Sequence, residues 1–277
     1  MHAAGEPFIL LEASDRTGGR VCTDTISTPE GDYLIDRGFQ VLLTAYPHAA
    51  QVFNYDELDL RSFYPGAMVF HDGEFHRIAD PRRRPGEAIR GFRSPIATML
   101  DKLRLAEMSM RVLSGTVQQV WSRPDRSALE ALRDSGFADA TIDRFFRPFF
   151  GGVFFDAQLT TSSRMLEFCF RMFAQGRVCV PAMGMGQLAA HLTVRLPSDA
   201  VHTGVRADRI ERRGSEWLLD TNQGQYKAKR VVVATEGDSS RALLAPHTRI
   251  ALPSVRWRQA ATISYACDAC PTNEAIL

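Results

Sequence analysis

The residues near the start of the chain whose types and spacing suggest chemistry are an acid, two arginines and two adjacent glycines. Glu12 directly follows the continuous apolar run 8–11, and Arg16, Gly18-Gly19 and Arg20 come next. A carboxylate at the end of a parallel strand can accept hydrogen bonds from the ribose hydroxyls of an adenosine. Adjacent glycines let the backbone approach a pyrophosphate, and the guanidinium groups can neutralise it. The pattern therefore predicts a nucleotide site at this strand end.

A second glycine pattern competes with the first. Gly184, Gly186 and Ala189 match GxGxxA between a predicted strand and a predicted helix, which is typical of a nicotinamide site. The next predicted strand ends in Thr203-Gly204 rather than in an acid, which disfavours that interpretation.

The thiols and imidazoles show no pattern of metal ligands. The five cysteines have no framework spacing, and the seven histidines show neither HxxxH nor HExxH. Cys267 and Cys270 form a lone CxxC, which we interpret as incidental because a zinc site needs a second pair. We expect free thiols in a reducing compartment and no metal site.

The overall composition excludes several function classes. The chain has 277 residues, 45% of them hydrophobic, and a formal net charge of +1. Such a balance creates no general attraction for nucleic acid or an anionic membrane. No apolar segment reaches the roughly 18–20 residues of a transmembrane helix, and the first residues lack the pattern of a signal peptide. We expect a cytoplasmic protein that acts on a small molecule, with no nucleic-acid partner; the oligomeric state is not predicted.

One local charge run departs from this balance. Residues 81–85 read PRRRP, which could contact nucleic acid or lipid. We interpret the run as a solvated loop.

The elements around the predicted site have α/β texture. Residues 8–11 predict a buried parallel strand, and residues 31–43 predict extended structure. The texture returns at 177–180 with a strand, then a helix over 187–196 and a strand over 201–203. An antiparallel meander follows over 209–211, 217–221 and 226–233, and it ends in a buried strand at Arg230–Val233 before a small-residue loop.

Between these stretches lies a hairpin followed by helices. Residues 67–78 predict a hairpin with a type I′ turn at Asp72-Gly73. One helix is predicted to begin at Ser94-Pro95 and to stop at Gly115, and Ser127 to Glu130 forms a capping box for a helix that ends near Gly136. A third helix should run from 140 to 150 and break at Pro148 and Gly151-Gly152, and a fourth should span 162–176.

This layout predicts an α/β cofactor domain built from two separated segments, with an α+β domain inserted between them. The expected division is residues 1–57 and 177–250 for the cofactor domain, 58–176 for the helical substrate domain, and 251–277 for the start of a returning substrate-domain segment.

Several segments resemble the flavin-containing amine oxidase, protoporphyrinogen oxidase and phytoene desaturase superfamily. The segment LLEASDRTGGRV is similar to the signature that follows the Rossmann unit of that family, and DRGFQVL at 36–42 resembles the stretch that passes the flavin. Residues 180–197, 201–210 and 229–235 resemble, in turn, its Gly-Gly-Met loop, the strand that packs on the adenine, and its ADRVVVAT pattern. The resemblance covers essentially the whole chain.

The resemblance implies an FAD-binding, Rossmann-like (GR2-type) domain and a flavoenzyme. Such an enzyme oxidises a C–N or C–C bond of a small, apolar substrate by hydride transfer to FAD, while the protein orients the substrate and excludes water. The implied cofactor-binding residues are Glu12, Ala13, Arg16, Gly18, Gly19, Arg20, Gly38, Phe39, Gln40, Val205 and Thr235. No catalytic residue is predicted.

The aromatic residues between 145 and 155 leave two interpretations open. Phe145, Phe146, Phe149, Phe150, Phe154 and Phe155 could line an apolar substrate cavity, or they could form ordinary helix core.

The position of Glu12 raises an expectation about the first strand. A Rossmann fingerprint places its glycines about 20 residues before the acid, whereas 11 residues precede Glu12. We therefore expect the domain to lack its first strand and phosphate-binding turn, so that the chain is a fragment that holds FAD poorly. The alternative function is a truncated, non-catalytic relative that acts as a binding module or is an incomplete gene product.

Overall fold

The computed structural model describes residues 4–87, 91, 93–248, 257–259, 261–267 and 275–276. The chain packs as two units, which divide at Gly38/Phe39 and at Met185/Gly186. The first unit comprises Met1–Gly38 and Gly186–Gln259, and the second comprises Phe39–Met185 and Ala260–Leu277. The sequence predicted divisions at 57/58 and 176/177 instead; the cofactor and substrate roles assigned to those segments stay predictions.

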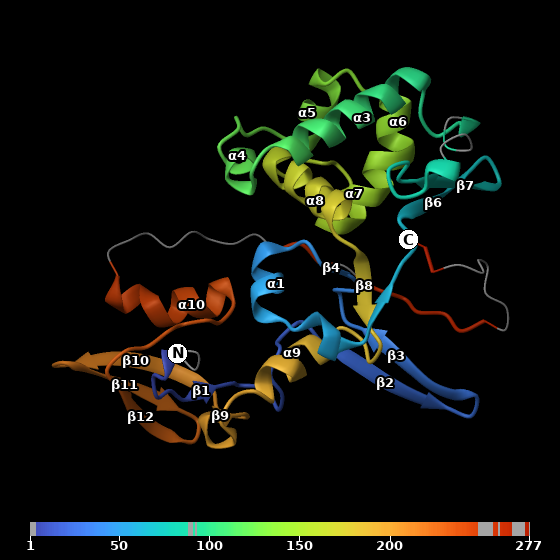
Figure 1. Ribbon diagram of the computed structural model, residues 1–277. Helices are drawn as coiled ribbons and strands as arrows, with labels where there is room; N and C mark the ends of the chain where they lie inside the picture. Colours follow the sequence, from blue (N-terminus) through green and yellow to red (C-terminus); the bar gives the residue numbers. More distant parts are fainter. Residues whose placement is uncertain are drawn as a thin grey trace. The chain divides into compact units, whose positions relative to one another are not determined.

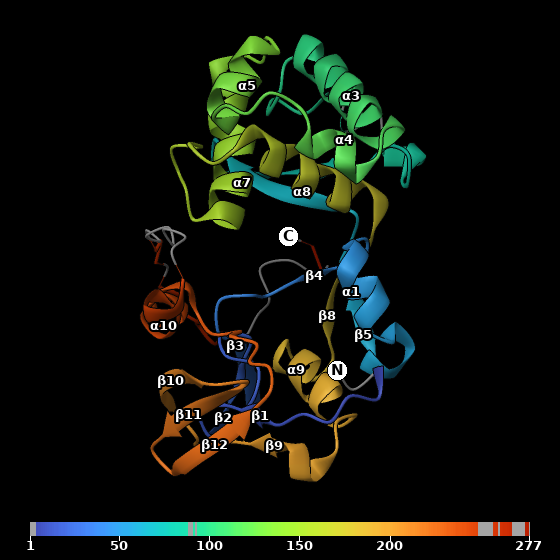
Figure 2. The same ribbon diagram turned by 90° about the vertical axis from the view of Figure 1, so that its left-hand side faces the viewer.

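The first unit contains eleven described elements, in chain order: β1 (Leu10–Leu11), β2 (Thr23–Thr28), β3 (Gly31–Asp36), α9 (Gly186–Thr193), η5 (Ser198–Ala200), β9 (Val201–His202), β10 (Ala207–Arg213), β11 (Glu216–Thr221), β12 (Gly224–Ala228), α10 (Gly237–Leu244) and η6 (Ala245–His247). Strands β10, β11 and β12 form the predicted antiparallel meander, and helix α10 lies against β10 (Figures 1 and 2). Strands β2 and β3 form a hairpin.

The predicted parallel strand is present but short, and it is not buried as predicted, since none of residues 8–11 is buried and Ile9 is 56% exposed. β1 pairs with β9 in parallel, with Leu10 opposite Val201. The pairing continues past both strands, because the amide of Glu12 donates to the His202 carbonyl at 2.9 Å and the amide of Val205 donates to the Glu12 carbonyl at 2.9 Å. Glu12 is thus fixed by its backbone at the carboxyl end of β1.

The buried strand predicted at Arg230–Val233 is wrong. β12 ends at Ala228, and residues 230–234 have no regular structure in the described chain. The side chain of Val232 is 67% exposed. An apolar run becomes a strand only where a neighbouring strand pairs with it, and no described strand pairs with this segment.

The second unit contains fifteen described elements, in chain order: β4 (Leu42–Leu43), α1 (Pro47–Val52), η2 (Tyr55–Leu58), β5 (Leu60–Ser62), β6 (Gly66–His71), β7 (Glu74–Ala79), η3 (Pro85–Glu87), α3 (Met99–Ser114), α4 (Val117–Trp121), α5 (Ala128–Asp134), α6 (Asp139–Thr141), the π-helical turn η4 (Ile142–Phe146), α7 (Arg147–Phe154), α8 (Ser163–Gln175) and β8 (Val178–Pro181). Strand β8 lies between β4 and β5 in a three-stranded sheet. Helices α3, α4 and α5 all contact α8 (Figure 1).

Local signals in this unit are mostly confirmed. The β6–β7 hairpin turns at Asp72 and Gly73, whose φ angles of 52° and 81° are those of a type I′ turn. The capping box at Ser127 is present, and α8 lies between its cap Ser162 and Gly176. Helix α3 begins later than predicted, because its first turn is capped by Thr98 rather than by Ser94.

The predicted break at Pro148 is wrong. Helix α7 runs through Pro148 and both glycines to Phe154, and the π-helical turn η4 precedes it. A proline cannot donate to the carbonyl four residues earlier and clashes with it. The wider turn changes the hydrogen-bond register, since the amide of Arg147 bonds to the carbonyl of Ile142. The proline then falls in the first turn of α7, where it is tolerated.

The core of the second unit forms where these helices meet. It contains Met108, Val112, Ala128, Leu132, Phe137, Ile142, Phe146, Phe150, Leu159, Leu166 and Cys169. Leu100, Leu103 and Met110 of α3 lie outside this core, because each is more than half exposed. Among the helices of the described residues, none has both the length and the apolar content to cross a bilayer.

Candidate functional site

The carboxylate of Glu12 lies at the carboxyl end of β1 and is half-buried. The Ser14 amide and hydroxyl both donate to Glu12 Oε1, at 2.8 and 2.7 Å. Oε2 accepts no hydrogen bond from any described residue. The turn at Ser14 therefore holds the carboxylate in place and leaves one oxygen able to accept from a ligand.

The two glycines that follow have different surroundings. Gly18 has a φ of +105°, and a Cβ at this position would lie 2.5 Å from Ala189 Cβ on α9. Thr17 and Thr193 share a hydrogen bond of 2.7 Å between their hydroxyls, which docks the same loop on α9. Gly19 has a φ of +55°, and no atom lies within 4 Å of a Cβ placed there. Gly18 thus serves a close approach of loop and helix, whereas Gly19 faces open space.

The backbone of this loop keeps donors available. The amides of Gly18, Gly19 and Arg20 donate no hydrogen bond to any described residue. Successive free amides in a glycine turn form the kind of concavity that binds anions.

The two arginines of the loop are turned toward their own chain. Arg16 Nη2 donates to the Gly19 carbonyl at 2.9 Å. Arg20 Nε lies 3.3 Å from Glu236 Oε1, and its guanidinium lies 4.9 Å from the centre of the Trp257 ring. The Arg20 side chain remains 65% exposed, so it stays accessible to an anion.

The other predicted cofactor residues are dispersed. Ala13 is exposed beside Glu12, and Val205 is buried in the segment that follows β9. Thr235 is exposed before α10, where its hydroxyl lies 3.0 Å from Ser240 Oγ. Gly38 ends the first segment of the first unit with a φ of +84°, whereas Phe39 and Gln40 are exposed residues of the second unit.

The competing glycine pattern is accounted for by packing. Gly184 has a φ of +80° and its amide donates to the Pro181 carbonyl at 2.9 Å, which closes a turn. At Gly186 a Cβ would lie 2.9 Å from the Thr23 amide nitrogen, and the Gly186 amide donates to Thr23 Oγ1 at 2.8 Å. Close approach to β2 therefore explains this glycine without a nicotinamide ligand.

Among the described residues, no three acidic, histidine or cysteine side chains gather as metal ligands would. Cys22, Cys169 and Cys179 are buried free thiols, and Cys267 is exposed. Cys270, the partner of Cys267 in the CxxC pattern, lies outside the described residues.

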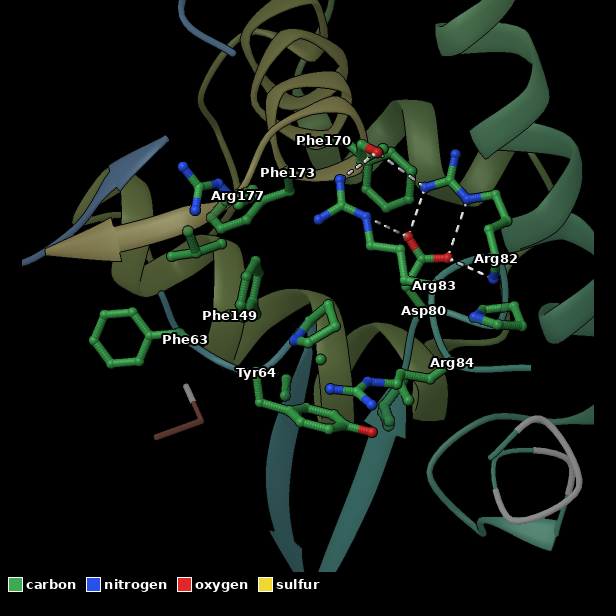
Figure 3. Close-up of a pocket in the computed structure, with 18 of the residues that line it drawn as sticks. Phe63, Tyr64, Asp80, Arg82, Arg83, Arg84, Phe149, Phe170, Phe173 and Arg177 are labelled. Atoms are coloured by element: carbon green, nitrogen blue, oxygen red, sulfur yellow. Dashed lines mark hydrogen bonds and ion pairs between the residues drawn. The ribbon is translucent and has the colours of Figure 1, made fainter. Parts of the chain in front are cut away.

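The second unit contains a pocket of about 660 Å³ (Figure 3). Its apolar wall is formed by Phe145, Phe149 and Phe150 packed against Phe170 and Phe173 of α8, and Phe63 also lines the pocket. The ring centroids of Phe149 and Phe173 lie 5.1 Å apart. The aromatic cluster is divided, because Phe146 is fully buried core while Phe145 and Phe149 line the pocket. The assignment of this pocket to a substrate stays a prediction. The volume is that of an ordinary small-molecule site.

The rim of this pocket is the basic run that the sequence led us to interpret as a solvated loop. Arg82, Arg83 and Arg84 all line the pocket, together with Asp80 and Arg177. The sequence alone could not place these arginines at a pocket. Arg82 and Arg83 are held by the Ala174 carbonyl at the end of α8, which lies about 90 residues further along the chain.

Several solved structures have a related fold at low sequence identity. An oxidoreductase from Methanosarcina mazei superposes with a TM-score of 0.63 at 17% identity over 89% of this chain and 57% of its own. A putrescine oxidase with bound putrescine gives 0.61 at 17% over 87% and 55%. Cyclohexylamine oxidase from Brevibacterium oxydans IH-35A gives 0.56 at 16% over 87% and 55%. The chain thus spans little more than half the length of these proteins and shares their fold.

The sequence pattern of one family accounts for nearly the whole chain. It matches residues 1–267 and describes flavin-containing amine oxidoreductases. The matched residues include the strand-end acid and the glycine loop of the first unit as well as the helices of the second unit. The chain belongs to the flavin-containing amine oxidoreductase family.

Proposed function

We propose that this chain is part of an FAD-dependent oxidoreductase that oxidises a C–N or C–C bond of a small substrate with an apolar body. The observation that carries the proposal is the loop after β1. There a fixed carboxylate with one uncommitted oxygen, Glu12, stands next to the free amides of residues 18–20. An acid for a ribose beside donors for a pyrophosphate is the arrangement that an adenine dinucleotide requires.

The residues of the first unit fit such a cofactor in chemical type. Glu12 would accept from the ribose hydroxyls, and Ala13 and Val205 would flank the adenosine. The backbone at Gly18-Gly19 and the exposed guanidinium of Arg20 would meet the pyrophosphate. Bound FAD supplies the acceptor for the two electrons removed from the substrate.

Five further predicted residues would act indirectly or at the edges of the cofactor. Arg16 would act indirectly, because its guanidinium holds the Gly19 carbonyl and so fixes the turn. Gly38, Phe39 and Gln40 would lie beside the flavin end of FAD. Thr235 would border the cofactor site from the loop before α10. These assignments rest on the family resemblance and on exposure.

The second unit would supply the substrate site. The phenylalanine wall can exclude water and orient an apolar body, which is what flavin chemistry asks of the protein. No side chain of the pocket is assigned as a proton carrier.

The test is FAD affinity in Glu12→Ala and Glu12→Gln variants, measured by titration of FAD fluorescence. A lost charge-assisted hydrogen bond is worth about 1.5–3 kcal/mol, so Glu12→Ala should weaken FAD binding about tenfold to a hundredfold. Glu216→Ala is the matched control, since Glu216 is an exposed acid at the start of β11 in the same unit. Equal affinity in Glu12→Ala and wild type, or no saturable FAD binding by the wild type, would contradict the proposal.

A further inference from the structure

The pocket of the second unit combines an apolar wall with an unusually basic rim. Six phenylalanines line it, and among the described lining residues four arginines and one aspartate carry the charge. At neutral pH these described residues have a net charge of +3, from four guanidinium groups and one carboxylate. A ligand that fills the pocket must therefore satisfy two different surroundings.

Asp80 organises the basic loop through its own hydrogen bonds. Its carboxylate accepts from the Arg82 amide at 3.0 Å and from the Arg82 guanidinium at 3.0 and 2.7 Å. Its carbonyl accepts from the amides of Arg83 and Arg84 at 3.0 and 2.9 Å. Burial raises the pKa of Asp80, but the hydrogen bonds and charge of Arg82 outweigh it and hold the pKa below its ordinary value. The acid thus stays ionised and is fully used inside the loop.

The end of α8 fixes two of the arginines against the wall. The Ala174 carbonyl, in the last turn of α8, accepts from Arg82 Nη2 at 3.2 Å and from Arg83 Nη2 at 3.0 Å (Figure 3). Cations are favoured at a helix C-terminus, where carbonyls lack partners. Each of these guanidinium groups keeps a second terminal nitrogen, Nη1, that donates to no described residue.

Two more arginines complete the rim. The Arg84 guanidinium lies 5.2 Å from the centre of the Tyr64 ring and makes no ion pair with a described residue. Arg177 lies across the pocket from Arg82 in Figure 3, and its Nη1 donates to Ser62 Oγ at 3.2 Å. Guanidinium groups therefore line the pocket at more than one side, while Asp80, the one carboxylate among the described lining residues, is occupied by Arg82 and Arg83.

We propose that this pocket binds a small carboxylate with an aromatic or aliphatic body, its body on the phenylalanine wall and its carboxylate at Arg83 and Arg84. Arginine is suited to a carboxylate because its planar fork donates two parallel hydrogen bonds. The same rim repels a cationic amine such as a diamine. The inference that this carboxylate is the substrate rests on the proposed function. The inference that the pocket binds it does not depend on the proposed function.

The test is a calorimetric titration of the whole chain with three matched probes at low salt: 4-phenylbutyrate, 4-phenylbutan-1-ol and 4-phenylbutan-1-amine. The three share one apolar body and differ in charge. We expect one site that binds the acid at least about tenfold more tightly than the alcohol, since one charge-assisted hydrogen bond is worth that much. The amine should bind more weakly still, and added salt should weaken only the acid.

Variants separate the rim from the wall. Arg84→Gln should weaken binding of the acid about tenfold and leave binding of the alcohol unchanged, because Arg84 is exposed and its side chain makes no hydrogen bond or ion pair with Asp80. Phe149→Leu should weaken acid and alcohol alike. Arg133→Gln is the charge-matched control; Arg133 is an exposed arginine of the same unit that pairs with Asp139 away from the pocket.

The results that would overturn the carboxylate site can be told apart from those that would overturn the FAD site. Equal affinity for acid and alcohol, tighter binding of the amine, an unchanged affinity in Arg84→Gln, or no binding of the acid at millimolar concentration would each overturn the proposal. FAD affinity, measured separately, should be the same in Arg84→Gln and wild type. Loss of FAD binding with retained selectivity for the acid would instead contradict the proposed flavoenzyme and leave the pocket assignment standing.

Discussion

Replacement of Gly18 by alanine should destabilise the first unit far more than the same change at Gly19. Alanine at a φ of +105° is strained by about 1–3 kcal/mol. Its Cβ would also lie 2.5 Å from Ala189 Cβ and 2.9 Å from the Val21 carbonyl oxygen. Carbon atoms prefer about 3.5–4.0 Å, so α9 or the loop must move, which costs about another 1–3 kcal/mol. The total loss for Gly18→Ala is about 2–6 kcal/mol.

Gly19→Ala would introduce backbone strain but no steric overlap. The left-handed φ of +55° costs alanine about 1–2 kcal/mol, and its Cβ meets nothing within 4 Å. The free energy of unfolding should be measured in urea by tryptophan fluorescence in a Trp121→Phe background. Trp217 and Trp257 then report on the first unit alone.

A second substitution tests the cause. Ala189→Gly removes the atom that Gly18→Ala would strike, so it should stabilise the Gly18→Ala variant. In the wild type, the same glycine in α9 should destabilise by about 1 kcal/mol. Equal losses for Gly18→Ala and Gly19→Ala, or the same effect of Ala189→Gly in both backgrounds, would refute the assignment of Gly18 to loop–helix packing.

Two further predictions concern the second unit. Asp101 is buried and accepts from Thr98, Thr141, Arg104 and the Ala138 amide; burial raises its pKa, but these partners together hold the pKa below the ordinary 3.8. Asp101→Asn should lower the free energy of unfolding by about 1–3 kcal/mol at pH 7. The difference between variant and wild type should shrink below pH 3.8, because protonation of Asp101 removes the same contribution from the wild type. A difference that is constant from pH 7 to pH 3 would contradict this. Burial raises the pKa of Cys169 to about 11. Iodoacetamide at pH 8 should therefore alkylate exposed Cys267 quickly and Cys169 only after unfolding, which peptide mass spectrometry can measure. Rapid labelling of Cys169 in the native protein would contradict this and show that the core around it opens.

The sequence predicted those features that depend on neighbouring residues. The Asp72-Gly73 turn, the Ser127 capping box and the Ser162 and Gly176 limits of α8 all follow from a few adjacent side chains. The loop after β1 was found for the same reason, since its acid, glycines and arginines are contiguous. Its assignment to FAD stays a prediction.

Features that depend on distant partners were missed. The helix at Pro148 continues because a π-helical turn changes the hydrogen-bond register, which no propensity of Pro148 indicates. The run at 230–233 is apolar but lacks a described pairing strand. The basic loop became the rim of a pocket because Asp80 folds it and the end of α8 holds it, and both effects require the tertiary structure.

The most direct test of the flavin assignment is amide hydrogen exchange with and without saturating FAD. The amides of residues 18–20 donate no hydrogen bond to described residues, so they should exchange rapidly in the free chain. We predict that FAD slows exchange at residues 13–20 and 203–206 and leaves α3 and α8 of the second unit unchanged. Unchanged exchange at residues 13–20 in FAD, or protection confined to α3 and α8, would contradict the account.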